Sequence, residues 1–203
     1  MNFESGRAAP VIHPSAQVAS SAVVSGDVHI GPNSYIAHGA VLVAEGGAVR
    51  IGADCVVMET AVIRGVPGQA MTLGDRVLVG PRAHLVGCTV EDDVFLATGA
   101  TVFNGAVIGR GSEVRINGLV HLRTTLPPDT VVPIGWVAVG TPALIRPSSD
   151  HDAIWEVQKP LDFPRHVFGL ERPAPGQSLM PALMPRYAAA LRRRHADDRA
   201  IEG

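Results

Sequence analysis

The sequence contains few cysteine and aromatic residues, and neither sign of charge dominates it. Its two cysteines, Cys55 and Cys88, are too few for a disulfide framework or a cysteine-rich zinc site, so each is expected to be a small buried residue. The 17 lysine and arginine side chains nearly balance the 19 acidic ones. Because a surface that binds nucleic acid needs a basic excess or a basic stripe, no nucleic-acid partner is expected.

Long hydrophobic runs are also missing, although 46% of the residues are hydrophobic. No stretch reaches the roughly 18 apolar residues that indicate a membrane-spanning helix. The first ten residues, MNFESGRAAP, lack the charged and then apolar segments of a secretory signal. We therefore expect no membrane partner and a cytoplasmic location, a reducing compartment in which free cysteines are usual.

What the sequence does contain is a repeat of six residues with a branched aliphatic residue at one position. An amphipathic helix would need spacings of three and four, and a half-buried strand would alternate with a spacing of two. Period six instead predicts a solenoid in which each hexapeptide makes one flat wall and its aliphatic side chain points into the core. The aliphatic residues are Val18, Val24, Ile30, Ile36, Leu42, Ile51, Val57, Ile63, Leu73, Val79, Leu85, Val90, Leu96, Val102, Ile108, Val114 and Val120.

Small residues and two interruptions accompany the repeat. The residue four places after most of the aliphatics is small, as at Ala22, Ser34 and Cys55. A small residue there lets the chain turn the corner between two walls, and three walls would close one triangular coil. The register breaks at the glycine-rich residues 44–48 and 65–72. Both breaks are predicted to be loops that extrude from one corner, where loops commonly wall a binding site.

The pattern divides the chain into a lead-in of residues 1–10, a β-helix domain of residues 11–147 and a C-terminal tail of residues 148–203. The start of the tail predicts a short helix capped by Ser149. The prolines that follow it predict irregular chain. A terminal helix is predicted from Pro185, with that proline in its first turn, and it should pack along the solenoid or cap its open end.

Two further segments stand out beside the repeat: the five-residue wall LVGCT of residues 85–89 and the exit VAVGTPALI of residues 137–145. Together with the repeat they resemble the γ-class carbonic anhydrase family over roughly residues 11–147. The resemblance implies an all-β solenoid, namely a left-handed parallel β-helix of hexapeptide repeats with a C-terminal helical tail. It also implies a homotrimer with three sites between neighbouring subunits.

The family that the chain resembles holds zinc with three histidines, and the resemblance places these ligands at Arg64, Pro81 and Val86. None of these three side chains can bind zinc, and the permanent positive charge of Arg64 would repel the ion. His84 lies near a corner and is not expected to replace a lost ligand. The sequence therefore predicts no metal site, no cofactor and no carbon dioxide hydration.

A remodelled pocket is predicted where the zinc site would be. Arg64 is expected either to pair with Glu59 of the adjacent subunit or, with it, to frame an anionic ligand. Met58, Val86 and Phe103 are expected to point outward and to form an apolar association surface. The residues predicted to bind a small organic or anionic ligand between subunits are Glu45, Met58, Pro81, Val86 and Phe103.

Three functions of different classes stay open. The main hypothesis is a trimeric protein that has lost the zinc site and either serves as a scaffold or, as we favour, binds a small organic or anionic ligand at the subunit interface. The second is a metal-independent enzyme in which Glu59, Arg64 and His84 are the catalytic acid–base and anchoring groups. The third is a coenzyme-A-dependent acyltransferase, an activity that occurs on the same fold with a histidine as general base.

Overall fold

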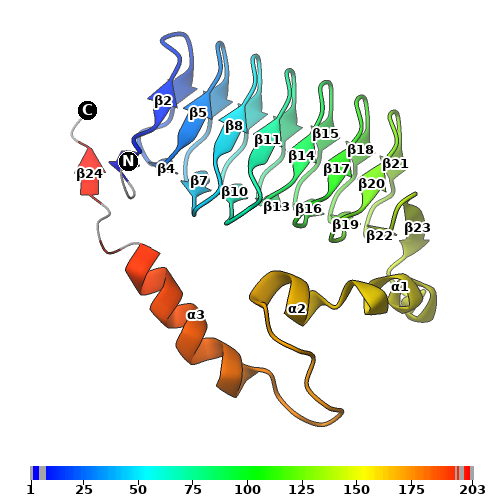
Figure 1. Ribbon diagram of the computed structural model, residues 1–203. Helices are drawn as coiled ribbons and strands as arrows, with labels where there is room; N and C mark the ends of the chain where they lie inside the picture. Colours follow the sequence, from blue (N-terminus) through cyan, green and yellow to red (C-terminus); the bar gives the residue numbers. More distant parts are fainter. Residues whose placement is uncertain (1, 5–7, 195, 197–198, 202–203) are drawn as a thin grey trace.

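The computed structural model describes residues 2–4, 8–194, 196 and 199–201, and most of it is a left-handed parallel β-helix (Figure 1). Short strands from successive coils stack into three sheets, as the repeat predicted. The polar sheet comprises β2 (Val11–Ile12), β5 (Val28–Ile30), β8 (Val49–Ile51), β11 (Met71–Leu73), β14 (Thr89–Val90), β17 (Val107–Ile108) and β20 (Thr125–Leu126). The open sheet comprises β3 (Gln17–Val18), β6 (Tyr35–Ile36), β9 (Val56–Val57), β12 (Leu78–Val79), β15 (Phe95–Leu96), β18 (Glu113–Val114) and β21 (Val131–Val132).

The third sheet, which we call the covered sheet because helices lie over it, has ten strands. Its edge strands β23 and β24 pair antiparallel with their neighbours β22 and β1. In spatial order it comprises β23 (Leu144–Pro147), β22 (Trp136–Val139), β19 (Leu119–Val120), β16 (Thr101–Val102), β13 (His84–Val86), β10 (Val62–Gly65), β7 (Val41–Ala44), β4 (Val23–Ser25), β1 (Asn2–Glu4) and β24 (Arg199–Ile201).

The core of the β-helix is built from the aliphatic residues of the repeat. Every aliphatic residue of the predicted series after Val18 is at most 5% exposed. On the covered sheet, Leu42, Ile63, Leu85 and Val102 are paired in register on successive strands, so their side chains stack in one inward column. Stacking at the strand separation of about 4.8 Å buries each side chain against its neighbours above and below.

Buried small residues form the corners between the walls. The hydroxyl of Ser34 donates a hydrogen bond to the carbonyl of Gly52 (2.8 Å) and accepts one from the amide of Cys55 (3.0 Å). A small polar side chain thereby forms hydrogen bonds with backbone groups of the next coil. A larger side chain would not fit in the corner. Both cysteines are free and buried, as predicted, and burial raises the pKa of Cys88 to about 12.

The two interruptions of the repeat are loops at the same corner, between the covered sheet and the polar sheet. They follow β7 and β10 and precede β8 and β11, as the sequence predicted. The loops pack on each other closely, because a Cβ atom on Gly65 would lie 2.1 Å from the carbonyl oxygen of Gly47. Glycine is therefore required at this contact, and the second loop stands above the end of β10.

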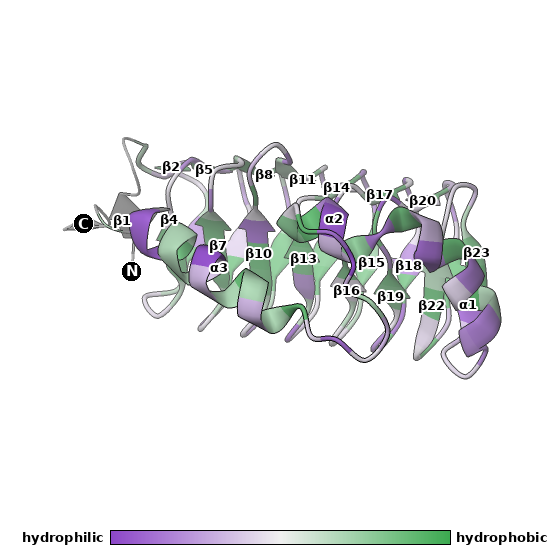
Figure 2. Cartoon of the chain, turned by 60° about the horizontal axis from the view of Figure 1, so that its bottom comes forward, coloured by the Kyte–Doolittle hydropathy of each residue, from purple (hydrophilic) through white to green (hydrophobic). Residues whose placement is uncertain are grey.

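The three outer faces of the β-helix differ in character. The polar sheet presents exposed polar residues such as His29 and Thr89. The open sheet presents exposed apolar residues, including Phe95 at 42% exposure. The covered sheet lies behind the C-terminal helices, of which α2 and α3 cross in front of its strands (Figure 2). Among the residues that the structure describes, helices of the same chain roof only this face.

The C-terminal tail contains α1 (His151–Gln158), the short 3-10 helix η1 (Lys159–Leu161), α2 (Phe163–Phe168) and α3 (Met180–Arg194). Helix α1 closes the end of the solenoid, since a Cβ atom on Gly140 would lie 2.9 Å from a methyl group of Val157. Helix α3 runs back along the β-helix toward the first coils (Figure 1). No helix in the described part of the chain has both the length and the apolar character needed to span a bilayer.

The tail departs from the sequence prediction in three places. The residue before α1 is Asp150, and no side chain caps the helix, so the predicted Ser149 cap is wrong. Helix α2 was not predicted, because its proline occupies the first turn and starts the helix where we expected irregular chain. Helix α3 begins at Met180, which leaves Pro185 inside it. The helix tolerates Pro185 because that turn is exposed and water can satisfy the freed carbonyl group.

Candidate functional site

A large cavity lies between the covered sheet and the tail that roofs it. Its volume is about 700 Å³. Strands β10, β13 and the chain after β16 provide the floor, the second loop (residues 65–72) provides one wall, and α2 and α3 provide the roof. All of these elements belong to one chain, whereas the sequence predicted a pocket between subunits.

Strand alternation brings the floor residues together. Ile63 and Leu85 point into the core, so their strand neighbours Arg64, His84 and Val86 must point outward. Arg64 and Val86 are paired in register on adjacent strands and stand side by side. The sequence placed two of the lost zinc ligands at these two positions, and the structure shows that they are neighbours.

A chain of aromatic rings holds the roof against the floor. Phe103, after β16, contacts Phe163 of α2 edge-to-face with ring centroids 6.5 Å apart. Phe163 contacts Phe168 at 5.8 Å, and Phe168 contacts Tyr187 of α3 at 5.9 Å, again edge-to-face. Each such pair contributes about 0.5 to 1.5 kcal/mol beyond the burial of its apolar area. The aromatic chain therefore fixes both helices over the cavity.

An ion pair occupies one end of the cavity. A guanidinium nitrogen of Arg64 donates a short hydrogen bond to a carboxylate oxygen of Glu45, and the two side chains are 26% and 11% exposed. Burial alone would lower the pKa of Arg64, but the hydrogen bond and charge of Glu45, with smaller contributions from Tyr187, outweigh burial and raise that pKa. Arg64 is therefore charged, and its charge is balanced within the same chain.

Two histidines, His84 in the cavity and His121 beside Phe103, are held in their neutral form. Burial, and secondarily the charge of Arg64, lowers the pKa of His84. Burial also lowers the pKa of His121, whose ring lies 6.0 Å from that of Phe103. The Nδ1 atom of His121 is buried and has no hydrogen-bond partner among the described residues. Neither histidine contributes positive charge to the cavity near neutral pH.

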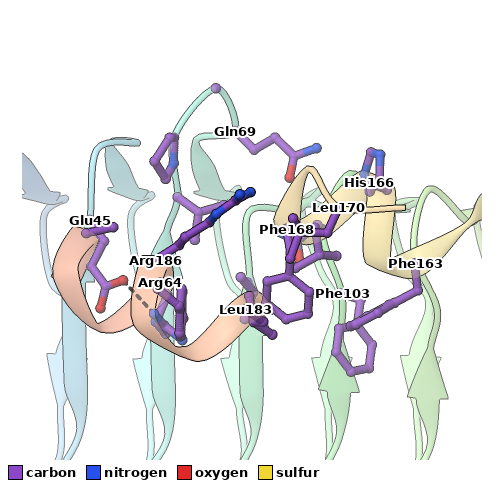
Figure 3. Close-up of a pocket in the computed structure, with 18 of the residues that line it drawn as sticks. Glu45, Arg64, Gln69, Phe103, Phe163, His166, Phe168, Leu170, Leu183 and Arg186 are labelled. Carbon is purple, nitrogen blue, oxygen red and sulfur yellow. Dashed lines mark hydrogen bonds and ion pairs between the residues drawn. The ribbon is translucent and has the colours of Figure 1, made fainter. Parts of the chain in front are cut away.

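The rim of the cavity is polar. Arg186 of α3 is exposed and reaches toward the loop that contains Gln69, whose amide points in turn toward His166 of α2 (Figure 3). Gln69 lies across the corner of the solenoid, because a Cβ atom on Gly87 would come 3.0 Å from its Cβ atom. Glycine at this corner leaves the room that Gln69 occupies.

The structure brings together five of the eight residues predicted for the site. Glu45, Arg64, His84, Val86 and Phe103 all line this cavity. The prediction that Val86 and Phe103 form an association surface is wrong, because the tail of the same chain covers them and Val86 is only 8% exposed.

The other three predicted residues lie elsewhere. Met58 and Pro81 line a second cavity of about 380 Å³ on the open sheet, together with Leu78, Phe95, Ile116 and Ile134. Glu59 lines neither cavity; it is an exposed turn residue, and its carbonyl accepts a hydrogen bond from Thr60 (2.6 Å). Within one chain, Glu45 and not Glu59 is the carboxylate that meets Arg64.

Sequence reasoning missed the residues that the tail contributes. They include Phe163, Phe168, Leu183, Arg186 and Tyr187. The only signal was the helical segment that contains Arg186 and Tyr187, and a helix pattern does not show which strands its side chains will meet.

The donor groups of the site do not fit zinc. The three positions where the resemblance implies histidines hold arginine, proline and valine. In the described part of the chain, no three His, Cys, Asp or Glu side chains gather closely enough to hold an ion. A zinc site needs at least three such donors, and Arg64 would repel the cation.

Comparison with known proteins agrees with the architecture. The model of the family described as "Bacterial transferase hexapeptide (six repeats)" matches residues 9–44. "Gamma carbonic anhydrase 1, mitochondrial" of Arabidopsis thaliana is 30% identical over 195 residues, which cover 93% of this chain and 67% of that relative. The "Carnitine operon protein CaiE" of Escherichia coli is 29% identical over 148 residues, which cover 72% of each chain.

The remaining comparisons cover less of the relatives' length or show lower identity. The chain spans 53% and 38% of the length of two further gamma carbonic anhydrases of Arabidopsis thaliana. Among solved structures, a hexapeptide transferase family protein from Anaplasma phagocytophilum matches with a TM-score of 0.50 and 22% identity, covering 77% of this chain and 89% of that one. At this identity the likeness shows the fold alone.

A double-mutant cycle should measure the ion pair of the cavity. We expect Arg64→Gln and Glu45→Gln each to lower the free energy of unfolding, since each strands a partly buried charge. The double variant should lose less free energy of unfolding than the two single variants lose together, and chemical denaturation should give a coupling energy of about 1 to 2 kcal/mol. Strictly additive losses would mean that the pair contributes nothing to stability.

The lowered pKa values of His84 and His121 predict acid sensitivity. In the unfolded chain a histidine takes up a proton below about pH 6.5, whereas these two resist it in the folded protein. The free energy of unfolding should therefore fall as the pH drops below 6.5. Asp27 and Asp93 also have lowered pKa values, but these carboxyl groups change the free energy of unfolding only below about pH 4, where an unfolded chain would protonate them. The variant His121→Phe should flatten the dependence between pH 6.5 and 5; an unchanged slope would contradict this assignment.

Proposed function

Because this chain belongs to the gamma carbonic anhydrase family of hexapeptide-repeat proteins, we propose that it is a member that works without zinc and binds a small organic anion. One observation supports this most directly. Two of the positions where zinc ligands are expected, Arg64 and Val86, form the floor of a cavity of about 700 Å³. That volume is typical of sites for organic ligands and far exceeds what carbon dioxide or bicarbonate requires.

The proposal includes a trimer assembled through the open sheet. Its outer face presents a contiguous set of exposed apolar side chains, including Phe95 and Ile116, with Ile134 at 62% exposure. Exposed apolar patches of this kind mark association surfaces. Members of this family are homotrimers, and of the two uncovered faces the open sheet is the more apolar one, so we propose it for such a contact.

A metal-independent enzyme is a second candidate. His84 lies in the cavity, and its lowered pKa leaves it neutral and able to accept a proton. Of the other two groups proposed for catalysis, Arg64 lines the cavity and Glu59 does not. An acyltransferase activity has only the shared fold in its favour, and a shared fold does not specify a reaction.

The trimer should depend on the open sheet. Sedimentation of the unaltered protein at micromolar concentration is expected to give three chains per particle. The variant Phe95→Glu places a charge in the apolar contact and should shift the protein toward monomer. The matched control Val11→Glu alters an exposed apolar residue of the polar sheet and should leave the trimer intact. A monomeric unaltered protein would remove the assembly from the proposal.

Zinc binding should return when its ligands are restored. We expect the purified protein to contain well under one zinc per chain and to show no carbon dioxide hydration. The triple variant Arg64→His, Pro81→His and Val86→His should bind zinc, because residues 64 and 86 stand on adjacent strands and the family resemblance implies that a neighbouring chain supplies the third ligand. Adding Phe95→Glu to the triple variant should abolish zinc binding, because this change is expected to disrupt the trimer that supplies the third ligand.

Two results would count against this proposal. One zinc per chain in the unaltered protein, measured by elemental analysis, would contradict the loss of the site. A triple variant that stays trimeric but binds no zinc would show that the three positions are not the family's ligand positions.

A further inference from the structure

The charges of the large cavity do not cancel. The ion pair of Arg64 with Glu45 balances one positive charge against one negative charge. Arg186 also lines the cavity and forms no ion pair with any other residue that the structure describes. The cavity therefore has one uncompensated positive charge, and it lies on α3 at the rim.

The apolar part of the cavity lies below that charge. Figure 3 shows Leu183, Phe168 and Phe103 as neighbours, below the end of the Arg186 side chain that extends toward the loop of Gln69. Leu183 is buried, and the ring of Phe168 is held by Phe163 and Tyr187. A molecule that fills this space would place an apolar body against these side chains and a polar group at the rim.

We propose that the cavity takes a monocarboxylate with an apolar, preferably aromatic, body. Its carboxylate would accept hydrogen bonds from the guanidinium of Arg186 and the amide of Gln69, and its body would pack against Phe103, Phe168 and Leu183. Arg64 is not the anion contact, since Glu45 already occupies its guanidinium. This inference rests on the proposed function, and it specifies the ligand class that the proposed function leaves open.

The same charges argue against other ligand classes. A phosphate ester carries close to two negative charges, and because Arg64 is already paired with Glu45, the one uncompensated positive charge of Arg186 would leave the second negative charge without a counter-charge. The single unpaired guanidinium matches one carboxylate, whose two oxygens fit the planar fork of arginine. A neutral ligand would leave Arg186 without a counter-charge and would gain nothing from it.

Three probes with similar bodies test the inference on the full chain: 3-phenylpropanoate, 3-phenylpropanamide and 2-phenylethyl phosphate. Titration calorimetry is expected to show that the carboxylate binds at least about tenfold more tightly than the amide, as a charge-assisted hydrogen bond provides. Arg186→Gln should remove this preference. Arg192→Gln, an exposed arginine on the same helix outside the cavity, should keep it. Because Arg186 is exposed, its replacement should not disturb folding.

The outcomes separate this inference from the proposed function. Equal affinity for the amide and the carboxylate, or an unchanged carboxylate affinity in Arg186→Gln, would overturn the inference and leave a ligand pocket in place. Tighter binding of the phosphate would also overturn it. If none of the three probes binds the unaltered protein, the inference fails together with the proposed pocket.

Discussion

The stacking of one inward aliphatic side chain per wall is the constraint on which the rest of the structure depends. Leu42, Ile63, Leu85 and Val102 pair in register on four successive strands and are fully buried. A slip of one residue would turn each of these side chains to the outer face, so burial fixes the register strongly. The register in turn fixes which residues stand side by side outside the core. Arg64 and Val86 meet in the cavity for this reason alone.

The site arises because one outer face of the solenoid is roofed by the tail of the same chain. The aromatic series from Phe103 through α2 to Tyr187 ties the roof to the floor. The two helices partly bury Arg64, which occupies a position where a zinc ligand would stand. Glu45 balances its charge beneath the roof, so the arginine can be accommodated there. The chemistry of the cavity is thereby changed from metal binding to the recognition of an organic anion, as we propose, without a change in the β-helix.

The β-helix and its loops could be predicted from the sequence because each wall is a local unit with a fixed period. The repeat specified the inward column, and its two interruptions specified the loops beside the cavity. The tail could not be predicted in this way. Pro164 and Pro185 lie in helices that local rules discouraged, and no period relates Phe168 or Arg186 to the strands that they face. The pairing of Arg64 with Glu45 could not be predicted either, because it depends on the conformation of the loop that contains Glu45. The glycines of that loop allow this conformation but do not specify it.

We propose that two of the three positions where the family's zinc ligands are expected, Arg64 and Val86, line a zinc-free cavity for an organic anion. High-resolution diffraction from crystals grown with zinc, including anomalous data at the zinc absorption edge, tests this most directly. We expect no anomalous peak among Arg64, Val86 and Pro81 of a neighbouring chain. After soaking with 3-phenylpropanoate, we expect electron density for a carboxylate beside Arg186. A zinc peak at the three positions, with an empty cavity under α3, would contradict it.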